Sequence, residues 1–371
     1  MSSRTAVLDR EAPGSPPAGI ATSLRLVALV PSHNEESQIA ATIESLLAQT
    51  RRPDEIIVVC DNCTDRTVEI ALGYPVRVME TVGNTSKKAG ALNQALDDLL
   101  PRLAPADAVL VMDADSVLEA AFLETALQRL ARGDVCAVGG TFTGQPGGGL
   151  VGMFQRNEYA RYARDVGRLK GKVLVLTGTA TVFSVAVLTE VARARENGRL
   201  PGDSKQVYDV RVLTEDNELT LALLHLGHRI ISPMGCRLTT EVMPTWQALA
   251  QQRLRWKRGA LENLTDYGWT AITRRYWGRQ LLSFLGVVVT LAYLSTVAWS
   301  FAVDGGLKLH PIWAVVTGIF ILERVITVRS RGPAQMALAA VLVVEMAFDI
   351  VLQAVQARAF LDSAFRRERR W

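Results

Sequence analysis

Cysteine is scarce in this chain, which has 4 cysteines among 371 residues. That number is too small for a disulfide scaffold in a chain of this length. Cys60 and Cys63 form a C-x-x-C pair, but no second pair or histidine pair follows at the spacing of a zinc site. We therefore predict reduced, mostly packed thiols, as on the cytosolic side of a membrane.

A large excess of charge of one sign is also lacking. The formal net charge is +4, which gives no strong basic field, so we expect no nucleic-acid partner. Basic residues are nonetheless concentrated in two places, residues 251–279 and the tail 366–370. Basic stretches beside apolar segments favour contact with the anionic head groups of a lipid membrane.

Residues 1–23 lack a continuous apolar run and contain Pro13, Pro16 and Pro17. This segment does not have the pattern of a signal peptide, and we predict a disordered leader. The glycine-rich stretch 144–149 does not form a strand–G-x-G-x-x-G–helix pattern, which excludes a dinucleotide site of that type and predicts a flexible loop.

From Leu24 onward, apolar runs alternate with segments of helical spacing. The predicted strands are 26–30, 55–60, 76–79, 109–112, 136–139 and 173–176, and the predicted helices include 39–47, 89–100 and 215–226. Thr214 is the expected N-cap of the last helix. This alternation predicts the α/β fold class, with right-handed crossovers, a mainly parallel sheet and flanking helices.

Long apolar runs appear only after residue 279. Residues 280–303 carry no charge and predict a transmembrane helix, whereas 311–328 and 334–353 are weaker candidates that contain charged residues. Arginines before the first candidate and after the second place both ends of a helical hairpin on the cytoplasmic side. The third segment either spans, lies in the interface or re-enters, and Arg324 either pairs with Glu345 or Asp349 or extends toward the membrane surface.

Asp113-Ala114-Asp115 follows a predicted buried strand. Ligands bind at the carboxyl ends of strands in open α/β sheets, and carboxylate oxygens suit a hard cation such as Mg²⁺ or Mn²⁺. Such a cation takes phosphate oxygens as further ligands, so the pair predicts a metal-bridged nucleotide diphosphate. A surface turn is the alternative.

Five further motifs accompany this pair in a fixed order. They are 29–36 (LVPSHNEE), 61–67 (DNCTDRT), 88–93 (KAGALN), 214–216 (TED) and 252–256 (QRLRW). Together they resemble the family 2 inverting glycosyltransferases with the GT-A fold, and the likeness is closer to membrane-bound members such as cellulose and hyaluronan synthases. The resemblance runs from about Leu26 to Trp256, and one departure from it is Cys63, which stands where glycine is usual.

The resemblance implies roles for individual residues. Donor-binding roles fall to Pro31, Asn34, Glu35, Asp61, Lys88, Asp113 and Arg255. Asp61 would accept a hydrogen bond from the base, Lys88 would meet the diphosphate, and Asp113 and Asp115 would bind Mn²⁺ or Mg²⁺. A turn-forming role for Asp61 is the alternative.

The resemblance also implies the catalytic and acceptor sites. Asp216, next to Glu215, would be the catalytic base that takes the proton of the acceptor hydroxyl. Acceptor-binding roles fall to Gly178, Thr179, Gln252 and Trp256. The alternatives are a capping carboxylate at Asp216, a buried strand and turn at 177–179, and an interfacial amphipathic helix around Trp256.

The expected organisation has five parts. They are a disordered leader (1–23), a GT-A catalytic domain (24–242), interfacial amphipathic helices (243–279), a transmembrane region of two or three helices (280–355) and a basic tail (356–371). The expected function is metal-dependent inverting transfer from a nucleotide sugar to a lipid-linked or membrane-proximal saccharide. The donor is expected to be a UDP-sugar, with UDP-glucose favoured, and the catalytic domain of this integral membrane protein is expected to be cytoplasmic.

Two alternative functions stay open. One is a polyprenyl-phosphate sugar synthase, and the other is a catalytically inactive membrane adaptor with a transferase-like domain. The adaptor would be expected to have lost acidic motifs, but Asp61, Asp113, Asp115 and Asp216 are all present. Two or three spans are few for a channel in one subunit, which favours short products unless a homo-oligomer forms through the transmembrane region.

Overall fold

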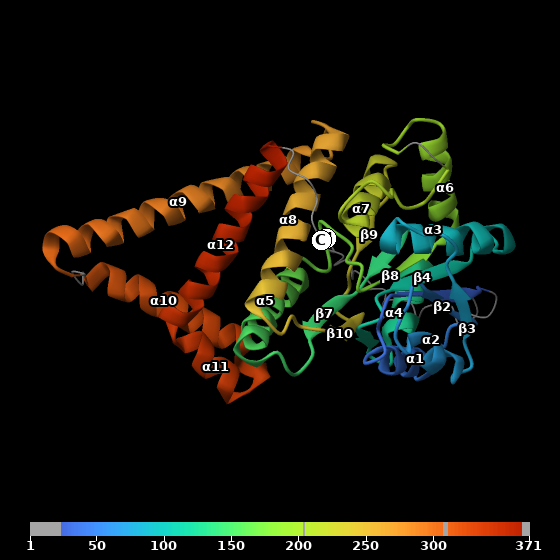
Figure 1. Cartoon of the computed structure of the whole chain (residues 1–371), viewed down its shortest axis with the longest axis horizontal. Helices are drawn as coiled ribbons and strands as arrows, with labels where there is room; N and C mark the ends of the chain where they lie inside the picture. The colour runs from blue at the N-terminus through green and yellow to red at the C-terminus, as the bar shows by residue number, and fades with distance from the viewer. Residues whose placement is uncertain (1–23, 203–204, 307–310, 366–371) are drawn as a thin grey trace, which may run out of the picture.

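The computed structural model describes residues 24–202, 205–306 and 311–365. The predicted leader 1–23 lies outside these residues. Figure 1 shows an α/β part built around a twisted sheet at one side and long C-terminal helices at the other, with α5 and α8 between them.

Seven strands form the central sheet. In spatial order they are β3 (Arg77–Glu80), β2 (Glu55–Cys60), β1 (Leu26–Ser32), β4 (Ala108–Met112), β8 (Ala180–Ser184), β6 (Ala137–Gly139) and β9 (Ile230–Ile231). The first four are parallel to one another, whereas β8 is antiparallel to both β4 and β6. The sheet is therefore mixed, and the predicted parallel arrangement holds for its β3–β2–β1–β4 half and for the β6–β9 pair.

Helices cover both faces of this sheet. They are α1 (Ile39–Leu47), α2 (Thr67–Leu72), α3 (Lys87–Leu99), α4 (Phe122–Leu130), α6 (Val185–Glu196) and α7 (Glu215–His225). Strand β1 shows why two layers are needed: Val27 and Leu29 join one buried core with α3, α6 and α7, while Leu26, Ala28 and Val30 join another with α1 and α4. Successive strand residues face opposite sides, so a strand that is apolar throughout needs cover on both.

Residues 173–176 do not form the strand predicted there, because their backbone groups bind side chains. The N–H of Leu176 donates to Thr220 Oγ1 at 3.0 Å, and the carbonyl of Leu174 accepts from the Tyr276 hydroxyl at 2.6 Å. The chain enters the sheet only at β8, a strand absent from the prediction.

A second, three-stranded sheet lies beside the end of β4. Its order is β5 (Ser116–Leu118), β10 (Arg237–Thr240) and β7 (Thr141–Gly144). The predicted flexible loop 144–149 is also wrong in extent, because Gly144 ends β7 and Gly149 begins α5 (Gly149–Arg168). Gly148 between them has a φ of +65°, a conformation that glycine adopts at low cost.

The C-terminal region contains α8 (Trp246–Tyr267), α9 (Arg274–Asp304), α10 (Pro311–Val328), α11 (Pro333–Ala340) and α12 (Leu342–Ala364). Among the described residues, one helical stretch, Arg274–Val303, is long and apolar enough to cross a membrane, and only 6% of its apolar window is buried. The third predicted span is broken by a bend of 75° between α11 and α12, which together would make a second crossing. The number of crossings stays a prediction.

The structure bears on two predictions for this region, the basic tail and the partners of Arg324. Helix α12 continues to Ala364, so most of the predicted basic tail 356–371 that the structure describes is helical. Arg324 of α10 pairs with both Glu345 and Asp349 of α12, which confirms the predicted pairing. Glu345 is fully buried and also accepts hydrogen bonds from Asn157 and Arg161 of α5, at 3.0 and 3.1 Å. This cluster joins the C-terminal helices to the α/β part.

A second buried ion pair joins α6 to α7. Arg195 and Glu218 approach to 2.5 Å with side chains that are each 1% exposed. The other oxygen of Glu218 accepts a hydrogen bond of 2.6 Å from Tyr267 at the end of α8. Removing one partner of such a pair leaves an uncompensated buried charge.

We predict that Glu218→Leu lowers the free energy of unfolding by about 3–5 kcal/mol, because the Arg195 charge stays buried without its partner. The double variant Arg195→Met/Glu218→Leu should recover most of this loss, since two apolar side chains replace both charges. Thermal unfolding of the purified protein in detergent measures both effects. A double variant no more stable than the single one would contradict the explanation.

Candidate active site

Lys88, Asp113, Glu215 and Asp216 come together around Gly178. A Cβ atom placed on Gly178 would lie 2.9 Å from Lys88 Nζ, 3.5 Å from Asp216 Oδ2 and 3.6 Å from Asp113 Oδ2. These side chains come from the first turn of α3, the end of β4 and the first turn of α7. Three separate motifs of the sequence therefore meet at one glycine.

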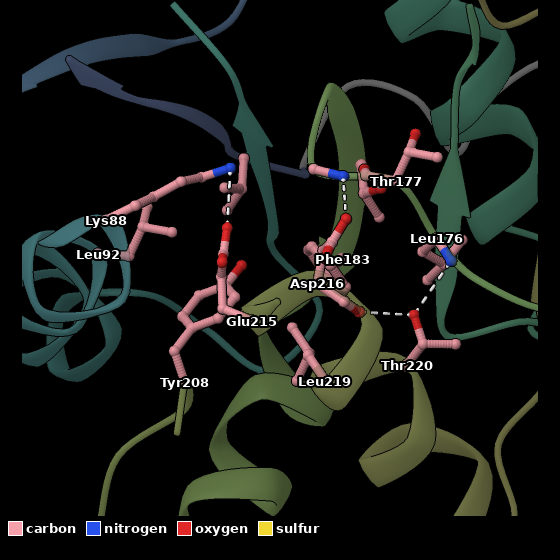
Figure 2. Close-up of a pocket in the computed structure, with 13 residues that line it drawn as sticks. Lys88, Leu92, Leu176, Thr177, Phe183, Tyr208, Glu215, Asp216, Leu219 and Thr220 are labelled. Carbon is pink, nitrogen blue, oxygen red and sulfur yellow. Dashed lines mark hydrogen bonds and ion pairs between the residues drawn. The ribbon is translucent and has the colours of Figure 1, made fainter. Parts of the chain in front are cut away.

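Lys88 holds two of the carboxylates. Its ammonium pairs with Asp113. It also lies 3.1 Å from Glu215 (Figure 2). Burial by itself lowers the pKa of Lys88, but Asp113 and Glu215 outweigh it and raise the pKa well above its usual value. Burial likewise raises the pKa of Glu215, and here Lys88 outweighs it and holds the pKa below its ordinary value. Lys88 and Glu215 are therefore a charged pair at neutral pH.

Asp216 accepts a backbone hydrogen bond from the Gly178 N–H at 2.9 Å (Figure 2). It accepts a second one from the Asn217 N–H at 2.7 Å. Burial, followed by the charge of Glu215, nevertheless raises the pKa of Asp216 to about 6, against the opposing effects of Lys88 and the two donors. The helix N-terminus does favour the ionised form, as expected, but burial is the larger effect. A carboxylate with this pKa is ionised at neutral pH and is more basic than an ordinary aspartate, as a general base requires.

Helix α8 fixes the start of α7, and with it Asp216. Asn263 Nδ2 donates to the Thr214 carbonyl at 3.2 Å, to Thr214 Oγ1 at 3.3 Å and to Asn217 Oδ1 at 2.9 Å. A Cβ on Gly259 would lie 2.5 Å from Thr214 Oγ1, so only glycine permits this approach. Thr214 occupies the predicted N-cap position, but its side chain makes no capping hydrogen bond.

Asp115 points into the region between the two sheets. Its Oδ1 atom accepts hydrogen bonds from Ser116 at 3.1 Å and Thr240 at 3.3 Å, and the described residues provide no hydrogen bond to Oδ2. Burial, followed by the charge of Asp113, raises the pKa of Asp115 to about 6. Burial, followed by the charge of Asp115, raises the pKa of Glu35 to about 7. These carboxylates therefore share a region in which negative charge is poorly compensated.

The carboxylates of Asp113 and Asp115 fit a divalent cation. No group of three or more His, Cys, Asp or Glu side chains in the described residues could hold a metal without further ligands. Mg²⁺ and Mn²⁺ prefer oxygen ligands, and Mg²⁺ is typically held by one or two carboxylates together with substrate phosphates. A cation would offset both the burial and the repulsion by Asp113 that raise the pKa of Asp115, so the donor set suits a metal that arrives with a diphosphate.

Asp61 and Asn34 form a second group at the ends of β1 and β2. Asp61 is buried, and its Oδ1 atom accepts hydrogen bonds from Asn62, Thr81 and Asn84 at 2.7–3.0 Å. No donor in the described part of the chain binds Oδ2. Asn34 has a φ of +57°, and its Oδ1 accepts from the Thr64 N–H at 2.7 Å. Asn34 thus shapes the loop, whereas Asp61 keeps one oxygen available to a ligand.

The other residues predicted to bind the sugar donor or the acceptor either make backbone contacts or lie on α8. Pro31 is paired with Val59 in the sheet, and the Thr179 carbonyl accepts from the Asp113 N–H at 3.2 Å. Gln252 and Trp256 lie on α8, and neither forms a hydrogen bond or ion pair with the Lys88 group in the described part of the chain. Arg255 is exposed but lies within electrostatic range of Glu215 and Lys87.

Arg253 is the buried arginine of the 252–256 motif, whereas Arg255, the predicted donor-binding residue, is exposed. It is 3% exposed, pairs with Glu158 of α5 at 2.8 Å and lies 4.3 Å from the centre of the Trp256 ring. Trp256 itself is 37% exposed. The motif contains two arginines, and the position of Arg253 four residues after the buried Leu249 is the signal that distinguishes the buried one.

A comparison with protein families finds that residues 25–259 match the model described as "Glycosyltransferase like family 2". Two relatives are poly-β-1,6-N-acetyl-D-glucosamine synthase of Staphylococcus aureus and the probable glycosyltransferase YdaM of Bacillus subtilis. The first is 26% identical over 72% of this chain, and the second is 25% identical over 81% of this chain and 73% of its own length. The chain spans 63% of the length of the S. aureus relative.

Among solved structures, the mannosyltransferase PcManGT of Pyrobaculum calidifontis, determined with GDP-mannose and Mn²⁺, superposes with a TM-score of 0.60. The alignment covers 94% of this chain and 89% of that one at 18% identity. At this identity the likeness concerns the fold, and it supports the GT-A-like arrangement of a mixed sheet with flanking helices.

We predict that Gly178→Ala reduces the enzyme's activity at least tenfold while leaving the fold intact. The added methyl group would lie 2.9 Å from Lys88 Nζ, which must move away from the carboxylates. Gly278→Ala is the matched control, because a Cβ there meets no atom within 4 Å. Sugar-transfer rates and circular dichroism of both variants test this, and full activity of Gly178→Ala would show that the cluster tolerates displacement.

Proposed function

This chain belongs to glycosyltransferase family 2, and from that premise we propose that it transfers a sugar from a nucleotide diphosphate to an acceptor hydroxyl with inversion. The observation that carries the proposal is the convergence of Asp216, Asp113 and Lys88 on Gly178. The buried Asp216 lies within a few ångströms of Lys88 and Asp113, the residues expected at the diphosphate. An in-line displacement needs its base this close to the group that leaves.

In the proposed reaction, the acceptor oxygen attacks the anomeric carbon as the bond from that carbon to the diphosphate breaks. Asp216 takes the proton of the acceptor hydroxyl, and the nucleoside diphosphate leaves with the bonding electrons. Attack occurs on the face opposite to the leaving group, so an α-linked donor gives a β-linked product. The backbone N–H groups of Gly178 and Asn217 orient the Asp216 carboxylate for this step.

Donor binding falls to the other residues of the site. Asp61 Oδ2 accepts a hydrogen bond from the base, and Lys88 and Arg255 supply positive charge for the diphosphate. Asp113 and Asp115 would hold Mn²⁺ or Mg²⁺, which when bound offsets charge on the diphosphate. PcManGT was determined with Mn²⁺ and a nucleotide sugar, which supports the use of both by this chain.

We further propose a UDP-sugar donor and a saccharide or lipid-linked saccharide acceptor at a cytoplasmic site on the membrane. The exposed apolar surface of α9 and the name of the S. aureus relative, a polysaccharide synthase, support these assignments. A polyprenyl-phosphate acceptor is less well supported, because a phosphate oxygen is already anionic near neutral pH and needs no base like Asp216. Membranes incubated with labelled UDP-glucose, UDP-N-acetylglucosamine and GDP-mannose, with and without Mn²⁺, test the donor.

Asp216→Asn should lower kcat by about 10²–10⁴, the usual contribution of general-base catalysis. Nucleoside diphosphate affinity should change little, because the amide keeps the shape of the carboxylate. In the unmodified enzyme, the raised pKa predicts that activity falls as the pH drops below about 6, where Asp216 becomes protonated. Asp165→Asn, at an exposed carboxylate of α5, is the control, and an active Asp216→Asn variant would refute the base assignment.

Asp115→Ala should abolish the Mn²⁺-dependent part of UDP binding, measured by titration calorimetry with and without the metal. Wild-type metal-dependent binding should weaken as the pH falls through about 6, because protonated Asp115 cannot act as a ligand. Asp134→Ala, at an exposed carboxylate paired with Arg129, provides the control. Metal-dependent UDP binding that persists in Asp115→Ala would remove this residue from the metal site.

A further inference from the structure

A cavity of about 560 Å³ lies between α8, α9 and α12, outside the group around Gly178. Its polar wall contains Glu158, Arg253, Lys257, Gln353 and Gln356. Figure 1 shows α12 running beside α8, with α9 extending away from the α/β part. The volume is many times that of one water molecule and lies in the range of small-molecule sites.

Three residues of this wall carry buried polar atoms that have no hydrogen-bond partner among the residues that the structure describes. They are Arg253 Nε, Gln353 Oε1 and Gln356 Nε2. Gln356 is 4% exposed, so a buried side chain with an unpartnered amide donor forms part of the cavity wall. An unpaired buried donor costs about 1–3 kcal/mol, and such groups are rare in native proteins unless something binds them.

The charges around the cavity favour an anion. Arg253 is paired with Glu158, and Asp349, another lining residue, is paired with Arg324. Lys257 forms no ion pair with any residue in the described ranges. Of the charged groups that act on it, Arg253 and Arg279 are positive and Glu158 is negative. The unmatched positive charge therefore comes from Lys257, which lines the same cavity as the two glutamines.

Another part of the wall is apolar and reaches α9. It includes Val289 of α9 with Met346, Ile350 and Leu352 of α12. Val289 is 66% exposed, so the apolar side of the cavity merges with the exposed surface of α9. A ligand with an anionic head and a hydrocarbon chain matches both parts.

We propose that this cavity binds the phosphate-bearing head group of an amphiphile, with the phosphate at Lys257 and Gln356 and the hydrocarbon chain along α9. Such a phosphate could be supplied by an anionic membrane phospholipid or by a polyprenyl phosphate. Binding here is independent of the sugar-transfer step, because the cavity shares no lining residue with the group around Asp216.

The test uses the full-length protein in nanodiscs of phosphatidylcholine, with phosphatidylglycerol or undecaprenyl phosphate added. Native mass spectrometry of the released protein should show adducts with an added anionic lipid, and the preferred lipid identifies the source of the phosphate. Lys257→Met and Gln356→Leu should each weaken that binding about tenfold, the loss expected for one charge-assisted contact. Lys172→Met, at an exposed lysine outside the cavity, should bind as the wild type does.

Thermal unfolding separates a ligand contact from a purely structural role. Without anionic lipid, Gln356→Leu should be as stable as the wild type or more so, because it removes an unpaired donor. The anionic lipid should raise the Tm of the wild type but not of either variant. Adducts that persist undiminished in both variants, equal retention of phosphatidylcholine, or a lowered Tm of Gln356→Leu in phosphatidylcholine alone would overturn the proposal.

Discussion

The ammonium of Lys88 is the interaction on which the candidate site depends. Asp113, Glu215 and Asp216 lie close together, and three carboxylates at such distances would repel one another strongly in a partly buried region. Lys88 pairs with two of them and lowers the proton affinity of the third. The fold can bring β4 and the start of α7 together because α3 places this single cation between them.

Lys88 does not compensate all of the negative charge in this region, and the uncompensated carboxylates can take part in chemistry. Asp216 and Asp115 keep raised pKa values, and both retain negative charge that the protein does not neutralise. In the proposed reaction, Asp216 removes a proton and Asp115 helps to bind a cation and diphosphate. Sites that perform acid–base work commonly show such perturbed carboxylates.

The sequence predicted the elements whose signals are local. Strands β1, β2 and β4 are continuous apolar runs, and the motifs at their ends identified Asp61, Asp113 and Asp115 before any contact was known. The missed elements depend on distant partners: Thr141 of β7 pairs with Arg237 of β10, and β8 exists because β4 and β6 flank it. The burial of Arg253 and the approach of Gly259 to Thr214 are likewise properties of packing. The spacing of Arg253 from Leu249 distinguishes it from Arg255 only once Leu249 is known to be buried.

Helix α8 makes three sets of contacts through different faces. Asn263 and Gly259 hold the start of α7, Trp256 presents an aromatic surface, and Lys257 faces the cavity beside α9. Each residue of an α-helix turns the chain by about 100° and advances it by about 1.5 Å. A single insertion or deletion between Trp256 and Gly259 would rotate one set of contacts away from its partner. The length of this segment is consequently more constrained than the chemistry of most of its side chains, and natural variation in α8 should occur by substitution rather than by change of register.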